Sequence, residues 1–161
     1  MSAHGYTVAV EWTGNRGVGT SGYREYGRDH VVSAAEKAAI LGSADPTFRG
    51  DRDRWNPEEM LLAALAQCHM LSYLHAAVEA GVTVVSYHDE ATASLRVHRD
   101  GSGDITEAVL RPVVTVADPE MAERATDAHE RAAALCFIAR SVAFPVRHEP
   151  RVEFAAQGLA D

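Results

Sequence analysis

The sequence predicts an α+β protein, on three observations. Two long apolar segments carry helix start signals, and short segments around them alternate apolar and polar residues as strands do. These segments follow one another in the order β-β-β-α-β-β-β-α-β. The 161 residues are 47% hydrophobic, which is enough for one sizeable core, so we expect a single domain over residues 1–161.

The first three strands lie in residues 6–33. Residues 6–12 alternate large apolar side chains with small or polar ones, the period of a half-buried strand. A glycine-rich turn follows, and Gly17 to Gly22 matches G-x-G-x-x-G. A dinucleotide site needs a helix directly after that pattern. Residues 23–32 instead predict two short strands, so we reject nucleotide binding here. Residues 34–55 predict a polar connection, long enough to cover a site.

The central helix is predicted over residues 54–81. Asn56 can cap free amides, Pro57 suits the first helical position, and acidic residues follow at the positive end of the helix dipole. Gly81 supplies the stop. The segment between is almost continuously apolar, so this helix is expected to be buried on all sides. Cys68 lies in its middle.

The rest of the chain predicts a meander, a second helix and a last strand. Residues 82–88, 91–98 and 105–116 are strand-like, with a hairpin turn at 100–103. Asp118, Pro119 and Glu120 repeat the cap, proline and acid start signal. The helix that they open contains Cys136 and ends before Pro145, and residues 146–154 predict the last strand.

Charge and composition exclude several partners. The formal charge is −8, with 15 Lys and Arg scattered among 23 Asp and Glu, which disfavours nucleic acid and an anionic membrane surface. The central helix carries Gln67, His69, His75 and Glu79, which a lipid-spanning helix rarely tolerates. The first residues lack a basic, apolar leader, so we expect a cytoplasmic protein.

The two cysteines, Cys68 and Cys136, are the candidate chemical groups. In a cytoplasmic protein they are redox-active, metal-binding or simply buried. Nearby histidines raise the metal alternative, but their helical spacing does not suit shared ligation, and we expect no metal. A thiol in an apolar helix needs a nearby cation to become a thiolate, and an arginine serves this best because it stays charged.

A family resemblance joins these features. The run Asn56-Pro57-Glu58-Glu59, with Cys68 ten residues after the first glutamate and Cys136 near the C-terminus, resembles the osmotically inducible protein C and organic hydroperoxide resistance (OsmC/Ohr) family. The resemblance covers most of the chain. It implies an OsmC-like fold, an intertwined homodimer and a stress-response peroxidase that reduces organic hydroperoxides, with an external dithiol as reductant and no bound cofactor.

The resemblance also implies site residues. The reactive cysteine corresponds to Cys68, the resolving cysteine to Cys136, the helix-start glutamate to Glu58 and the family arginine to Arg28 in Gly27-Arg28-Asp29. Other arginines are also in range, so Arg28 is the weakest of these matches. The chain departs from better-known members at two positions, where Phe137 replaces a proline and Ala133 replaces a histidine. We therefore expect the helix to continue through Cys136.

Helix geometry adds a constraint to this assignment. Ten residues of straight helix separate Glu58 from Cys68 by about 15 Å, too far for one arginine to bridge easily. Either the helix is broken, or the carboxylate and the thiol of one site come from two chains.

The alternative function is an OsmC-fold binding or stress protein that holds a lipophilic or thiol ligand without turnover.

Overall fold

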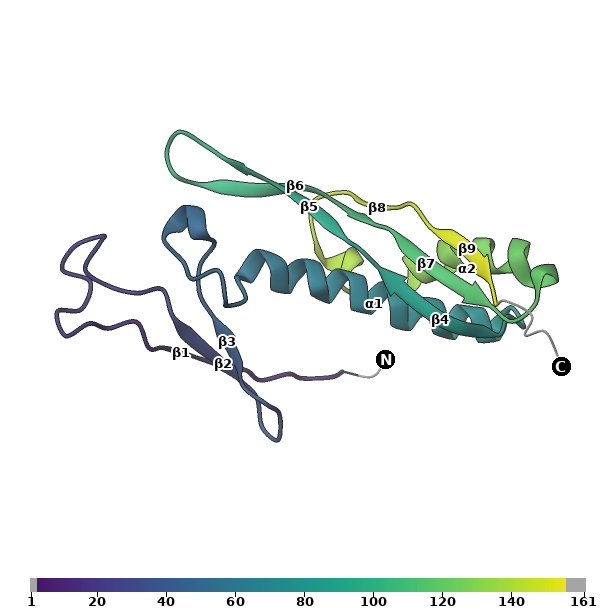
Figure 1. Ribbon diagram of the computed structural model, residues 1–161, viewed down its shortest axis with the longest axis horizontal. Coiled ribbons are helices and arrows are strands. Elements are labelled where there is room, and N and C mark those ends of the chain that lie inside the picture. The colour runs from purple at the N-terminus through teal and green to yellow at the C-terminus, as the bar shows by residue number, and fades with distance from the viewer. Residues whose placement is uncertain (1–2, 156–161) are drawn as a thin grey trace, which may run out of the picture. The chain divides into compact units, whose positions relative to one another are not determined.

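The computed structural model describes residues 3–155, which form an α+β chain (Figure 1). This confirms the predicted fold class. The chain divides into two compact units, residues 1–61 and 62–161, and the single-domain expectation stays a prediction. The elements are β1 (Ala9–Trp12), β2 (His30–Ser33), β3 (Ile40–Gly42), α1 (Pro57–Glu79), β4 (Val84–Asp89), β5 (Thr92–Val97), β6 (Gly103–Leu110), β7 (Pro112–Val116), α2 (Ala122–Leu135), β8 (Val146–His148) and β9 (Arg151–Phe154), with short 3-10 turns at Pro46–Phe48, Pro119–Met121 and Ala139–Ser141.

The first unit carries an antiparallel sheet in the order β1-β2-β3. Two predictions are wrong here. Residues 23–26 form a turn and a bend and residues 27–29 are irregular, so Arg28 lies in a loop rather than in a strand. Residues 40–42 form a strand inside the segment predicted as a polar connection. Three residues are too few to display a strand period, which is why the sequence did not reveal β3.

The start of α1 is a reciprocal capping arrangement. The Glu59 amide donates to Asn56 Oδ1 at 2.8 Å, and the Asn56 amide donates to Glu59 Oε2 at 3.2 Å. At the other end Gly81 has φ 67°, and the Val82 amide donates to the Ala77 carbonyl at 2.8 Å. Both predicted boundary signals are confirmed. The helix runs unbroken from 57 to 79, which removes the broken-helix alternative.

The second unit carries two three-stranded sheets, β4-β7-β9 and β5-β6-β8. The strands β8 and β9 pair in parallel with β6 and β7. The single strand predicted over 105–116 is wrong, because the chain changes sheets at Arg111, whose amide donates to Asp89 Oδ1 at 2.7 Å. The strand predicted over 146–154 likewise divides before Arg151.

The helix α2 ends one residue before Cys136. Cys136 has φ −70° and ψ 107°, an extended conformation, so the expectation that the helix continues through it is wrong. The Ala139 amide donates to Cys136 Sγ at 3.4 Å, and the Arg140 amide to the Cys136 carbonyl at 3.2 Å. These local bonds close a separate turn after Cys136, which leads into the 3-10 turn Ala139–Ser141.

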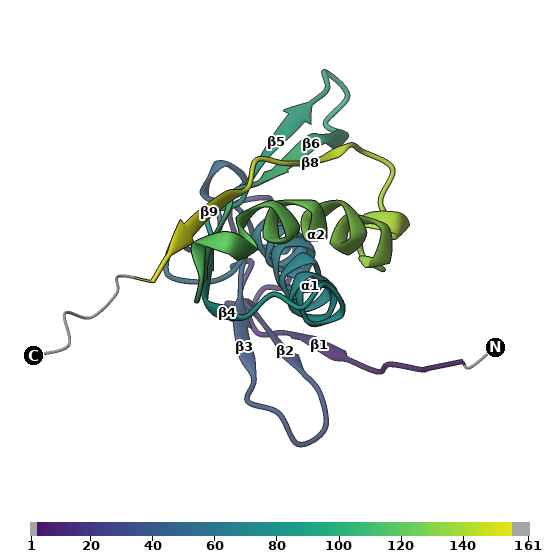
Figure 2. The same ribbon diagram turned by 90° about the vertical axis from the view of Figure 1, so that its right-hand side faces the viewer.

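The main core of the second unit lies where α2 crosses α1 (Figure 2). It contains the buried residues Tyr73, Ala76, Ala77, Val82, Val114, Val116, Ala125, Ala128 and Ala132. Within residues 3–155, α1 is the one helix long and apolar enough to span a membrane by length and composition. Its Tyr73 hydroxyl donates to the Ala125 carbonyl of α2 at 3.0 Å. The expected burial of α1 on all sides is wrong for the single chain, because Leu71 and Val78 are exposed.

Candidate active site

The two thiols meet inside the second unit. Cys68 is half-buried in α1, Cys136 is buried directly after α2, and both are free cysteines. Burial, and then a hydrogen bond with the Cys68 side chain, raise the pKa of Cys136 to about 11. Cys136 therefore keeps its proton at neutral pH, with the Cys68 side chain close enough to act on it. This is the arrangement expected for a nucleophile beside a resolving thiol.

Two buried histidines, His69 and His129, and the half-buried His148 form a cluster in the second unit. His69 follows Cys68 in α1, His129 lies in α2, and His148 ends β8. His69 Nε2 lies 3.1 Å from His129 Nδ1. The ring centroids of His69 and His148 are 4.2 Å apart, and those of Tyr73 and His129 are 4.0 Å apart. From the sequence, His69 and His129 were considered as metal ligands or ordinary helix residues, and His148 carried no signal of a role.

Burial keeps these imidazoles neutral. It lowers the pKa of His69 to about 3 and that of His129 to about 4, and neighbouring histidines add to both effects. The pKa of His148 is also lowered by burial, opposed by the nearby Asp89 carboxylate. In the described part of the chain no three His, Cys, Asp or Glu side chains converge to hold a metal ion.

Arg28 lies in the first unit, held by its own loop. Its guanidinium donates from Nη1 to the Tyr26 carbonyl at 2.7 Å and from Nη2 to the Tyr23 carbonyl at 2.9 Å. It also stacks on both tyrosine rings, 4.1 and 4.4 Å from their centroids. Contacts with Tyr23 and Tyr26 therefore set the position of Arg28. Neither tyrosine was among the predicted site residues.

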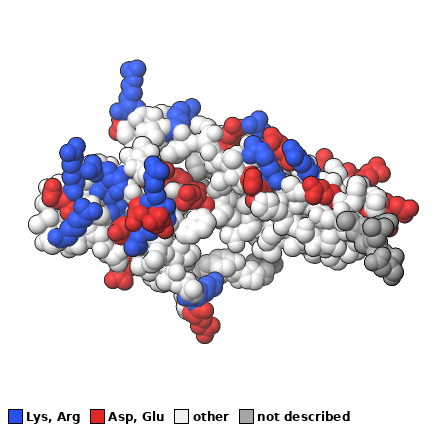
Figure 3. All heavy atoms as spheres, viewed as in Figure 1, with Lys and Arg blue, Asp and Glu red and all other residues white. Residues whose placement is uncertain are grey.

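A hollow of about 530 Å³ surrounds Arg28 in the same unit. Its charged lining residues are Arg16, Arg28, Asp29, Arg49, Asp51, Arg52 and Asp53. Figure 3 shows the basic side chains gathered over these loops, at the left of the view. Of the loop arginines, Arg54 contacts Asp29 and Asp51, both at 3.9 Å. The other arginines of the 49–54 segment have no carboxylate within ion-pair distance among residues 3–155.

Glu58 lies half-buried in the first turn of α1. The four predicted site residues thus divide in two: Arg28 and Glu58 belong to the first unit, Cys68 and Cys136 to the second. The structure brings the two thiols together. A shared site for all four side chains stays a prediction.

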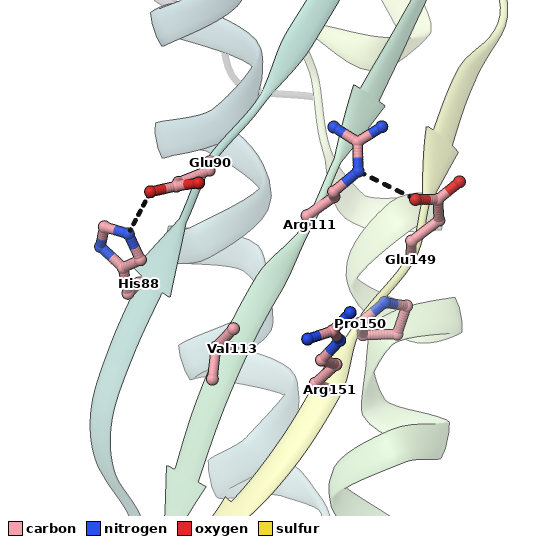
Figure 4. A pocket seen from close by; sticks show the side chains of 7 residues that line it. All are labelled: His88, Glu90, Arg111, Val113, Glu149, Pro150 and Arg151. Carbon is pink, nitrogen blue, oxygen red and sulfur yellow. Dashed lines mark hydrogen bonds and ion pairs between the residues drawn. The ribbon is translucent and has the colours of Figure 1, made fainter.

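A hollow in the second unit, of about 450 Å³, contains neither thiol. Figure 4 shows Arg111 turned toward Glu149, 2.9 Å apart, and His88 toward Glu90, 3.6 Å apart. The charges that line it are largely paired with one another. The thiol pair is therefore the better candidate for chemistry.

The chain is thus an α+β protein with two neighbouring thiols, one of them in the middle of a capped helix. The family model for OsmC-like proteins matches residues 50–151, more than half of the sequence. The chain belongs to the OsmC-like family. None of the curated proteins matches it.

Solved structures support the same assignment. An OsmC-like protein of unknown function from Vibrio cholerae is 30% identical, with a TM-score of 0.81 over 92% of this chain and 99% of that one. An organic hydroperoxide resistance protein from Elizabethkingia anophelis is 16% identical, with a TM-score of 0.66 over 96% and 100%. A second one, from Legionella pneumophila, is 13% identical, with a TM-score of 0.69 over 95% and 99%. The last two likenesses establish the shared fold.

Proposed function

We propose that the protein is a thiol-dependent peroxidase that reduces organic hydroperoxides to alcohols. The observation that carries this proposal is the proximity of the Cys68 thiol to the buried Cys136 thiol. Membership of the OsmC-like family and the fold shared with organic hydroperoxide resistance proteins support it. The proposal assigns Cys68 as the nucleophile, Cys136 as the resolving thiol, and Arg28 with Glu58 as the charged pair that favours the thiolate.

The proposed reaction has three balanced steps. The Cys68 thiolate attacks the terminal peroxide oxygen, the O–O bond breaks, and the alkoxide takes a proton and leaves as the alcohol. Cys68 is now a sulfenic acid, oxidised by two electrons. The Cys136 thiol attacks its sulfur, forming the disulfide and releasing water. An external dithiol then reduces the disulfide by exchange and becomes a disulfide itself, so no bound cofactor is needed.

We further propose that the working form is a homodimer with composite sites. The side chains of Tyr6, Val8 and Val10 are 93%, 66% and 66% exposed, although they share one face of the first strand segment. The apolar residues Leu71 and Val78 of α1 are also exposed. A second copy that covers these surfaces would also let Glu58 of one chain lie in the site of Cys68 of the other. Within one chain the unbroken helix keeps Glu58 and Cys68 too far apart to share a site.

The test is consumption of an organic hydroperoxide by the purified protein with a dithiol reductant. We expect turnover in the wild type, none in Cys68→Ser, and slower turnover in Cys136→Ser, in which the dithiol must itself condense with the Cys68 sulfenic acid. Hydroperoxide loss that survives Cys68→Ser would overturn the proposal. Stoichiometric binding of a lipophilic or thiol ligand without any turnover would instead favour the binding-protein alternative.

A further inference from the structure

We propose that the buried His69–His129 contact is a positioning device that holds Cys68 and Cys136 in register for disulfide formation. The inference rests on the proposed peroxidase function. It assigns to the two histidines a role in the second chemical step, acting through the thiols rather than on the substrate.

The contact joins the two helices beside the two thiols. His69 is the next residue after Cys68, so its side chain points about 100° away around α1 and into the core. His129 lies in α2, six residues before its last residue Leu135, and Cys136 follows directly after that end. The 3.1 Å separation of His69 Nε2 and His129 Nδ1 therefore joins α1, at the residue after Cys68, to α2, about two helical turns before its end at Cys136. The Tyr73 hydroxyl bond to Ala125 adds a second tie farther along both helices.

The cluster is built to hold one arrangement. His69 and His129 are only 0% and 4% exposed, and their rings are nearly parallel, 11° apart. Tyr73 covers the other side of His129, with an interplanar angle of 23°. Water does not reach these buried imidazoles. Breaking the bond would therefore leave His69 Nε2 and His129 Nδ1 without a hydrogen-bond partner in the core. The unbonded arrangement is therefore disfavoured, and the bond acts as a fixed spacer.

Disulfide formation is the step that depends on such a spacer. A disulfide requires Cα atoms about 4.4–6.8 Å apart and a narrow range of torsion, so small shifts between α1 and the end of α2 matter. Attack of Cys68 on a diffusing hydroperoxide has no such demand on Cys136. Loss of the histidine contact should therefore slow the second step and spare the first.

The two ring nitrogens in the contact allow a matched set of variants. Gln places an amide near the position of His Nε2, and Asn places one near Nδ1. His69→Gln and His129→Asn should thus keep the hydrogen bond, whereas His69→Leu and His129→Leu remove it. His75→Leu is the control, because His75 lies on the same helix, its side chain is 65% exposed and it contacts Glu79 on the surface.

The experiment uses one equivalent of hydroperoxide and follows the steps separately. Peroxide loss reports the first step, and thiol loss with trapping of the sulfenic acid by dimedone reports the second. In the Leu variants we expect a first step within about twofold of wild type and disulfide formation slowed about tenfold or more, with dimedone adduct accumulating. The Gln, Asn and His75→Leu variants should form the disulfide within about threefold of the wild-type rate.

A second oxidant separates this inference from the peroxidase proposal. Diamide converts neighbouring thiols to a disulfide without a peroxide, so it tests positioning even in a protein with no peroxidase activity. Wild-type disulfide rates in folded Leu variants, or amide variants as slow as the Leu variants, would overturn the inference. If a Leu variant does not fold, Tyr73→Phe removes the neighbouring tie and must slow the disulfide step in the same direction. An unchanged rate there counts against the proposal.

Discussion

At the scale of single residues, His69, His129 and His148 make the second unit sensitive to acid. Their folded-state pKa values lie below the ordinary value of about 6.5, to about 3 for His69 and about 4 for His129. The unfolded chain therefore binds protons that the folded chain refuses as pH falls from 6.5 toward 4. The stability that the neutral cluster provides is fully present above pH 6.5 and is lost through that window.

The expected outcome is a urea midpoint that falls steeply between pH 6.5 and pH 4. The double variant His69→Gln with His129→Asn keeps the hydrogen bond and removes two titrating rings, so its midpoint should fall less over the same interval. Asp89, whose pKa burial raises, stays in both proteins and does not affect the comparison. Equal pH slopes in the two proteins would contradict this assignment.

The candidate site was only partly predictable at this scale. Cys68 and Cys136 stood out because the chain has two cysteines, one of them within a core helix, and their side chains do meet. The clamp of Tyr23 and Tyr26 on Arg28 was not predictable, because it depends on the path of a turn that the sequence suggested was strand. The contact between His69 and His129 spans two helices, and no periodicity within one segment reports such a pairing.

At the scale of elements, the capped start of α1 carries a stability prediction. Asn56→Ala removes the acceptor of the Glu59 amide and should lower the free energy of unfolding by about 1 kcal/mol. Asn56→Asp keeps an acceptor oxygen and should stay near wild type. Chemical denaturation of the three proteins measures the difference. An Ala variant as stable as the Asp variant would mean that the cap contributes nothing.

Helices were read from the sequence better than strands. The signals that bound α1, from Asn56 to Gly81, are local and act through backbone hydrogen bonds that lie within a few residues. The strand boundaries at Arg111 and Arg151 depend instead on which distant strand each segment joins. A continuous apolar run such as 105–116 gives no sign that the chain passes from one sheet to another.

At the scale of the whole molecule, composite sites predict a complementation result. Glu58→Gln and Cys68→Ser are each expected to be inactive as homodimers. In a mixed dimer, one site would combine the intact Glu58 of one chain with the intact Cys68 of the other. Unfolding and refolding an equal mixture should therefore recover about a quarter of the wild-type sites.

The control is Cys68→Ser mixed with Cys136→Ser. In this mixture no chain carries both thiols, so the mixed dimers should not regain a site with an intact thiol pair. The readout throughout is hydroperoxide turnover with a dithiol, with the dimer population checked by light scattering. Recovery in the Glu58→Gln mixture supports sites shared between chains. No recovery, with mixed dimers demonstrably present, would place Glu58 and Cys68 of one site in the same chain.

The position of the thiols also bears on heat resistance. A disulfide between Cys68 and Cys136 would link the middle of α1 to the end of α2 and close a loop of about 68 residues. The lower conformational entropy of the unfolded chain would stabilise the folded protein by about 4 kcal/mol at 25 °C. After oxidation with an organic hydroperoxide, the protein should then melt at a higher temperature than the reduced protein. This difference should be absent in Cys136→Ser. A melting curve would in that case report the fraction of the protein that is in the disulfide form.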